Sequence, residues 1–136
     1  MSTTGAGMEL SEPITFRGAC DASGGVMLHT DLLVVANDED NVLRYYDLRA
    51  PDAMPVEEEW SERLEVEDEP GKNETDIESA TALGEQIFWI GSHSRSKSGK
   101  RRPDRQRIFA TRWVKTGPAS RLELVGKPYP NLLRGL

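Results

Sequence analysis

The chain has 136 residues, of which 37% are hydrophobic, and a formal net charge of −6. That size fits one domain with a modest core, and the acidic charge argues against nucleic acid or an anionic membrane as a general partner. No apolar run is long enough to cross a bilayer, and the first residues lack the basic and hydrophobic regions of a secretory signal. The single cysteine, Cys20, excludes an intramolecular disulfide and fits a reducing, cytoplasmic compartment; we expect it to be a small buried residue.

The first half of the chain predicts β-structure after an irregular start. Residues 1–13 carry no periodic pattern and are expected to form a flexible N-terminus ahead of a single domain over 14–133. The apolar run 32–36 predicts a strand, and the polar stretch 37–41 predicts a tight hairpin connection. The mixed run 42–48 predicts a second strand with one covered face.

Further along, one segment is ambiguous and three more are typical of strands. Residues 55–64 leave two interpretations open: a short helix, or a strand followed by a helical turn. The runs 86–91 and 107–114 predict a second pair of strands, whose hairpin is opened by the long loop 92–106. A last strand is predicted over 122–125, and the glycine and prolines that follow are expected to end it.

The two halves resemble each other when the sequence is shifted by 55 residues. The pairs that this shift brings together are Asp21 with Asp76, Leu28 with Leu83, Asp38 with His93, and 32–35 with 87–90. After about ten extra residues in the second copy, 43–46 lies over 108–111. The order of strand, turn and strand is therefore the same twice, which is the signature of a repeated sheet unit.

Two such units, over about 14–66 and 67–133, predict an all-β fold made of two β-propeller-type blades of antiparallel strands. Propellers close with about four to eight blades, so two blades leave a sheet face or edge uncovered. We expect an incomplete propeller, which either continues in missing C-terminal blades or is completed by self-association. Trp60, Trp89 and Trp113 are expected to pack within and between the blades rather than to form platforms for a ligand.

Five stretches carry a family resemblance: 16–24, 34–43, 76–80, 88–95 and 99–105. They resemble the opening part of a bacterial family, the domain of unknown function numbered 3616, over almost all of the chain. The resemblance implies a β-propeller-like fold of which this sequence would be the N-terminal part, and it implies no activity. Ser79 stands where the family pattern Asp-Ile-Glu-Gly has glycine, which puts the tightness of that turn in doubt. A more distant similarity is to phytase-like propellers, where such a turn lies near the mouth of the ring.

Four acidic residues are candidate metal ligands: Asp21, Asp38, Asp76 and Glu78. Equivalent positions of neighbouring blades lie at the same end of a ring, and carboxylates gathered there repel one another unless a cation lies between them. Carboxylate oxygens favour calcium or magnesium. In the alternative interpretation the aspartates cap turns by accepting hydrogen bonds from backbone N–H groups.

Basic residues suggest two further roles, each with a simpler alternative. His93, at the end of a predicted strand, is either a catalytic acid or base or a histidine hydrogen-bonded within a loop. The loop 95–107 offers guanidinium groups for a phosphate or another anion, namely those of Arg95, Arg101, Arg102 and Arg105. In the alternative, the loop is solvated or is neutralised by the acidic stretch 57–78.

Two functions are consistent with these patterns. The first is a non-catalytic binding or scaffold module, since no complete catalytic set is present, and this hypothesis expects no specific metal. The alternative is a phytase-like, divalent-metal-dependent phosphoester hydrolase with Asp21, Asp76 and Glu78 on the ion and His93 as acid or base. Neither hypothesis expects nucleic acid or a membrane as partner.

Overall fold

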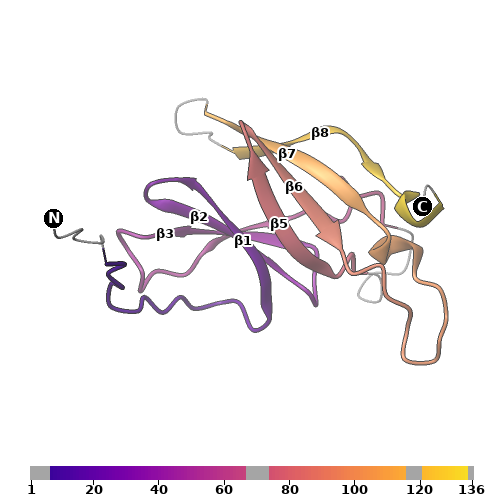
Figure 1. Ribbon diagram of the computed structural model, residues 1–136, viewed down its shortest axis with the longest axis horizontal. Coiled ribbons are helices and arrows are strands. Elements are labelled where there is room, and N and C mark those ends of the chain that lie inside the picture. Colours follow the sequence, from indigo (N-terminus) through magenta and orange to yellow (C-terminus); the bar gives the residue numbers. More distant parts are fainter. Residues whose placement is uncertain (1–6, 67–73, 116–120, 135–136) are drawn as a thin grey trace, which may run out of the picture.

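The computed structural model describes residues 7–66, 74–115 and 121–134, which form two antiparallel sheets of four strands each (Figure 1). Sheet A consists of β1 (Ala22–His29), β2 (Leu32–Asn37), β3 (Val42–Asp47) and β4 (Val56–Glu59). Sheet B consists of β5 (Ile77–Leu83), β6 (Gln86–Gly91), β7 (Ile108–Val114) and β8 (Arg121–Tyr129). The short 3₁₀ turns are η1 (Pro103–Arg105) and η3 (Leu132–Arg134). In both sheets each strand pairs with the next along the chain, so the predicted all-β fold of two blade-like units is confirmed.

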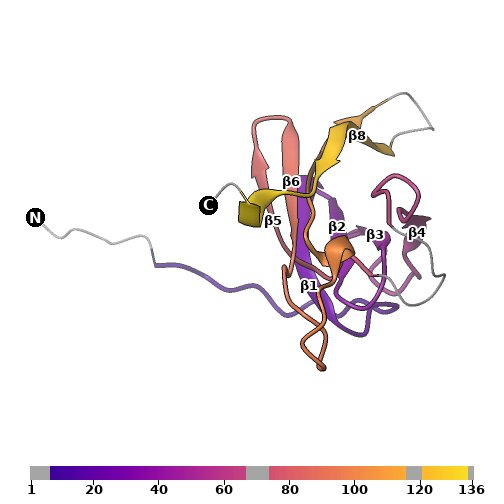
Figure 2. The ribbon, with the colours of Figure 1, turned by 90° about the vertical axis from the view of Figure 1, so that its right-hand side faces the viewer.

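Two predicted segments fall partly outside this description. The first six residues of the expected flexible N-terminus lie outside the described residues, as does the start of the second repeat, 67–73. Residues 7–13 contain no strand or helix and are exposed, and Figure 2 shows the N-terminal segment running away from the sheets. No helix within the described ranges is long and apolar enough to cross a membrane.

Alternation of side chains explains why the central strands form. In β6, Ile87 and Trp89 are buried and face sheet A, whereas Phe88 and Ile90 on the other face are half-buried. In β2, the fully buried Val34 belongs to the opposite inner face of the same core. The two sheets therefore share one core between their facing sides.

The first strands of the two sheets, β1 and β5, pack against each other. This contact requires small residues: a Cβ atom on Gly24 would lie only 3.3 Å from the backbone of Ser79. The Ser23 hydroxyl also donates a hydrogen bond to the carbonyl of Ile77, which joins the two strands directly. Each sheet thus begins beside the other, as neighbouring blades do at the axis of a ring.

Aromatic rings fill the space between the sheets. Phe109 lies between Trp60 and Trp89, with ring centroids 6.3 and 6.1 Å away, and all three rings are buried. The indole N–H of Trp89 donates to the Thr111 hydroxyl at 3.0 Å, so this buried donor is satisfied. Trp113 is only half-buried, at the edge of the core. The prediction that the tryptophans pack within and between the sheets is confirmed for Trp60 and Trp89.

The shift of 55 residues relates the starts of β1 and β5, whereas the strands that follow them are related by a shift of 54 residues. Ala22 pairs with Asn37 in sheet A, and the equivalent Ile77 pairs with Gly91 in sheet B. The reason is a register shift in β1 near its hairpin, which inserts one residue that β5 lacks.

This offset changes one predicted equivalence. The N–H of Asp38 donates to the carbonyl of Asp21 at 3.2 Å, and the N–H of Ser92 donates to the carbonyl of Asp76 at 2.8 Å. Asp38 is therefore equivalent to Ser92, and its predicted equivalence to His93 is wrong by one position.

Three other expectations are settled. The segment 55–64 is a strand followed by a turn, in which the N–H of Leu64 donates to the carbonyl of Trp60. The last strand does not stop at 125: β8 continues through Gly126 and Pro128, because a register shift opposite β7 accommodates them. Cys20 is exposed, so its predicted burial is wrong. It lies in the irregular segment before β1, outside the core.

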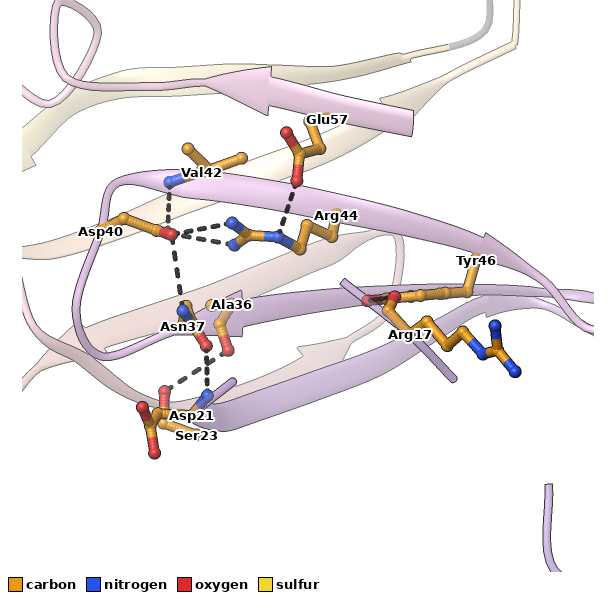
Figure 3. Close-up of polar contacts among 10 residues, drawn as sticks. All are labelled: Arg17, Asp21, Ser23, Ala36, Asn37, Asp40, Val42, Arg44, Tyr46 and Glu57. Carbon is orange, nitrogen blue, oxygen red and sulfur yellow. Dashed lines mark hydrogen bonds and ion pairs between the residues drawn. The ribbon is translucent and has the colours of Figure 1, made fainter. Parts of the chain in front are cut away.

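The outer face of sheet A is covered by ion pairs and by the N-terminal segment (Figure 3). The buried Arg44 donates to both oxygens of Asp40 and, at 3.1 Å, to Glu57. Burial works to raise the pKa of Asp40, but the hydrogen bonds from Arg44 and the backbone outweigh it and lower that pKa. The hydroxyl of Tyr46 donates to the carbonyl of Arg17 at 2.8 Å. This face is thereby closed by the chain itself.

Candidate metal centre between the two sheets

Three of the four predicted metal ligands meet where the sheets adjoin. Carboxylate oxygens of Asp38, Asp76 and Glu78 all lie within 4.8 Å of one another. Asp38 follows β2 in sheet A, Asp76 directly precedes β5, and Glu78 is its second residue. The cluster therefore takes one ligand from sheet A and two from sheet B.

Backbone irregularities aim the two ligands of sheet B. Asp76 has a positive φ of 53°, which is uncommon for a residue other than glycine. Glu78 is the extra residue at the register shift between Ile77 and Ser79. A bulge redirects a side chain out of the regular alternation, and here it allows both acids of the Asp-Ile-Glu segment to point to one place. Serine at position 79 is accommodated without a positive φ.

Asp21 does not belong to the cluster among the described residues, and the geometry explains why. The cluster combines the β2–β3 corner of one sheet with the first strand of the next. Asp21 precedes β1 as Asp76 precedes β5, and its carbonyl accepts the N–H of Asp38 at 3.2 Å, but its carboxylate is not among the clustered groups. From the sequence we expected equivalent positions of the two sheets, such as Asp21 and Asp76, to lie together. The structure instead brings together non-equivalent positions, Asp38 of sheet A with Asp76 and Glu78 of sheet B.

The electrostatics of the cluster favour a positive ion. Partial desolvation raises the pKa of Glu78, and the negative charges of Asp76 and Asp38 raise it further. A proton or a cation is thus bound more readily there than at an isolated glutamate. Arg105 offsets part of this charge: its guanidinium lies 3.7 Å from Asp76 and 2.6 Å from Glu74.

Asp38 provides a second observation in favour of a bound cation. Its Oδ1 atom is inaccessible to solvent and accepts no hydrogen bond from any described residue. Unpaired buried oxygens are rare because desolvating them costs roughly 1–3 kcal/mol.

The alternative that the aspartates cap turns is not observed. Within the described part of the chain, none of the carboxylates of Asp21, Asp38 and Asp76 accepts a backbone N–H. The turn at the β2–β3 corner is capped by Asp40, whose Oδ1 accepts the N–H of Val42 at 3.0 Å (Figure 3). The sequence could have given this signal, because Asp40 lies two residues before the strand, where such a cap is typical.

His93 lies beside the cluster without being part of it. It has a φ of 57°, its N–H donates to the carbonyl of Arg105, and its Nδ1 lies 2.9 Å from the carbonyl of Gly91. A carbonyl can only accept, so Nδ1 carries a proton in this contact. Nε2 is buried and has no partner in the described structure. The geometry matches the interpretation of a histidine hydrogen-bonded within its loop.

Most of the arginines predicted to bind an anion donate hydrogen bonds to the protein's own residues. Arg105 donates to Ser94 and Glu74, Arg101 to Gln106, and Arg95 to the carbonyl of Gly99. Arg102 is exposed. The loop projects from the body of the molecule (Figure 1), and Arg105, whose guanidinium lies 3.7 Å from Asp76, is the arginine of the four that contacts the carboxylate cluster in the described structure. Of the four predicted anion ligands, Arg105 follows the alternative of internal neutralisation most clearly.

Gly91 is required for the close packing around this junction. A Cβ atom there would lie 2.5 Å from the carbonyl oxygen of Arg105 and 2.6 Å from that of Thr75. Thr75 is fully buried, and its N–H donates to the side chain of Asn41 at 2.8 Å. Sequence reasoning did not single out Asn41 or Thr75, since a lone asparagine in a hairpin is ordinarily a turn residue.

No protein-family model, curated protein or solved structure matches this chain.

Proposed function

We propose that this protein is a non-catalytic binding module and that the cluster of Asp38, Asp76 and Glu78 binds a divalent cation. The observation that carries the proposal is the convergence of three carboxylates from two sheets within 4.8 Å. The unpaired, buried Oδ1 of Asp38 supports it independently. The raised pKa of Glu78, caused by desolvation and by the charges of Asp76 and Asp38, is consistent with it. A cation would neutralise the repulsion and join the two sheets at one end.

Calcium fits the ligands better than magnesium. Calcium accepts six to eight oxygens in irregular geometry, whereas magnesium demands a near-ideal octahedron and keeps several waters. Three carboxylates on a hairpin corner and a bulged strand form an irregular set. Each carboxylate can bind through one or both oxygens, and water would complete the shell because Glu78 is exposed.

A phytase-like phosphoester hydrolase is the weaker proposal. It needs an acid or base beside the ion and a free anion-binding group. The Nδ1 of His93 is engaged by Gly91, and Arg105 is engaged by Glu74 and Ser94. Arg105 and the Nδ1 of His93 are therefore already hydrogen-bonded to the protein's own residues.

We also propose that the protein acts as a scaffold and that its two sheets belong to an incomplete propeller. The outer face of sheet B carries a shallow apolar groove that includes Phe88, Ile90 and Ile108. The corresponding face of sheet A is closed by the N-terminal segment and the ion pairs of Arg44. This asymmetry supports continuation of the array at sheet B, in line with the resemblance to propellers of the domain family numbered 3616. The mass in solution tests whether a second copy completes it.

Calorimetric titration with calcium tests the proposed function. Wild-type protein should bind one ion, and Asp38→Asn, Asp76→Asn and Glu78→Gln should each weaken binding at least tenfold. Asp21→Asn is the matched control, because Asp21 is the equivalent of Asp76 outside the cluster, and it should leave binding unchanged. Absence of heat at millimolar calcium, or equal weakening by the control, would refute the proposal. A parallel assay with p-nitrophenyl phosphate and calcium should show no turnover; turnover lost in Glu78→Gln would favour the hydrolase instead.

A further inference from the structure

A second cleft lies at the other end of the two sheets. In sheet A, the β2–β3 corner carries Asp38, whereas the β1–β2 hairpin, at the opposite end of β2, carries Asp31. Near that hairpin a cavity of about 370 Å³ opens between the sheets. This volume falls at the small end of the range of ligand sites, which is about 300–1,000 Å³.

The floor of the cavity is apolar and aromatic. Leu32, Tyr45 and Val56 line it from sheet A, and Trp113 lines it from sheet B. The rings of Tyr45 and Trp113 have centroids 6.2 Å apart and are tilted by 42°, which is the spacing of an aromatic pair in contact. Both rings line the cavity, so an apolar group placed in it can contact them.

Most of the charges around the cavity are already paired. Asp47 binds Arg49, Glu58 binds Arg63, and Arg121 binds Glu123, with distances between 2.8 and 3.0 Å. The remaining glutamate, Glu57, binds Arg44. These ion pairs leave few unpaired charges on the lining of the cavity.

Two opposite charges are left over. The carboxylate of Asp31 makes no hydrogen bond or ion pair with a described residue, although it lies in the field of Arg49. The ammonium group of Lys115 has no partner in the same part of the chain. Both residues line the same cavity. A single ligand that fills the cavity can therefore lie against both charges.

We infer that this cavity binds a free α-amino acid with an aromatic or large aliphatic side chain. The apolar side chain would lie on Tyr45 and Trp113, the ammonium group would face Asp31, and the carboxylate would face Lys115. A ligand with only one charge would satisfy only one of the two groups. This inference does not depend on the proposed cation site, because the two sites share no residue.

The three tryptophan indole N–H groups provide a local readout by nuclear magnetic resonance. The indole N–H of Trp60 donates to Glu58 and that of Trp89 donates to Thr111. The indole of Trp113 lines the cavity, and its N–H donates to no described residue. Addition of L-phenylalanine, with EDTA present to remove cations, should shift the Trp113 signal until it saturates. The Trp89 signal should not move, and Trp113→Phe identifies the Trp113 peak.

Analogues that lack one charge test the assignment of the two charged residues. Phenethylamine lacks the carboxylate and 3-phenylpropanoate lacks the ammonium group, and each should bind about twofold to fivefold more weakly than phenylalanine. In Lys115→Gln the advantage of phenylalanine over phenethylamine should vanish, and in Asp31→Asn its advantage over 3-phenylpropanoate should vanish. Lys97→Gln and Asp52→Asn, on exposed residues outside the cavity, should preserve both differences. The inference is overturned if Trp113 shows no saturable shift at millimolar phenylalanine, or if a singly charged analogue binds wild-type protein as well as phenylalanine does.

Discussion

The side chain of Asn41 in sheet A is hydrogen-bonded to the segment that precedes β5 of sheet B. Replacing Asn41 with alanine measures how much its hydrogen bonds contribute to the stability of the fold. Its side-chain oxygen accepts the N–H of Thr75 at 2.8 Å, and its amide donates to the Ser61 hydroxyl at 3.0 Å. Thr75 is fully buried and Asn41 is 6% exposed, so water cannot replace these bonds in the mutant.

The magnitude follows from these two bonds. A buried N–H left without an acceptor costs about 1–3 kcal/mol, and the lost bond to Ser61 adds about 0.5–1.5 kcal/mol. Asn41→Ala should therefore lower the free energy of unfolding by roughly 2–4 kcal/mol. For a domain of this size the corresponding fall in melting temperature is about 10 °C.

Urea unfolding followed by circular dichroism provides the assay, with the slope checked for two-state behaviour. Ser61→Ala is the matched control, since it leaves the bond from Thr75 to Asn41 in place. It removes the partner of the Asn41 amide and the exposed bond from the Ser61 hydroxyl to Glu59, and should cost about 1 kcal/mol. If Asn41→Ala and Ser61→Ala lower the stability equally, the bond to Thr75 does not hold the sheets together and the reasoning is refuted.

Four further results are expected. Phe109→Ala should lower the free energy of unfolding by about 3–5 kcal/mol in urea denaturation, because this ring lies buried between two tryptophans. Gly91→Ala should cost about 3 kcal/mol in the same assay, because its Cβ would meet the carbonyl of Arg105; a loss below 0.5 kcal/mol would contradict that packing. Without cations, the protein should lose stability as pH rises from about 4.5 through the raised pKa of Glu78, because the unfolded chain releases this proton at a lower pH than the folded protein does. In Glu78→Gln this decrease of stability with pH should be smaller. Cys20 should react with a thiol reagent such as dithionitrobenzoate in the folded protein as fast as in urea, and protection in the folded state would contradict its exposure.

The sequence predicted the central strands because their apolar residues reveal them. The runs 32–36 and 86–91 are short, apolar and β-branched or aromatic, and both are strands. The first strands, β1 and β5, were not predicted, because they are rich in glycine, alanine, serine and threonine. That composition has a tertiary cause: the two strands pack so closely that a Cβ on Gly24 would press on Ser79. Local propensity carries no information about such a contact.

All three residues of the candidate cation site were predicted, but a fourth predicted ligand, Asp21, lies outside it. Asp38, Asp76 and Glu78 were identified from the repeat, but the assumption that equivalent loops converge added Asp21. The one-residue insertion in β1 and the offset between neighbouring sheets arise only when both sheets are in place. The cavity residues Asp31 and Lys115 gave no signal, since isolated charged residues in a hairpin and at a strand end are ordinary surface residues.

Paramagnetic broadening by manganese tests the central claim most directly, because it reports on both sheets in one spectrum. Manganese accepts oxygen ligands as calcium does, and it broadens the amide signals of nearby residues. With substoichiometric manganese, the amides of Asp38, Asp76 and Glu78 should broaden together, and excess calcium should restore them. Broadening confined to another acidic segment such as 57–59, or broadening at Asp38 without Asp76, would contradict a site shared between the two sheets.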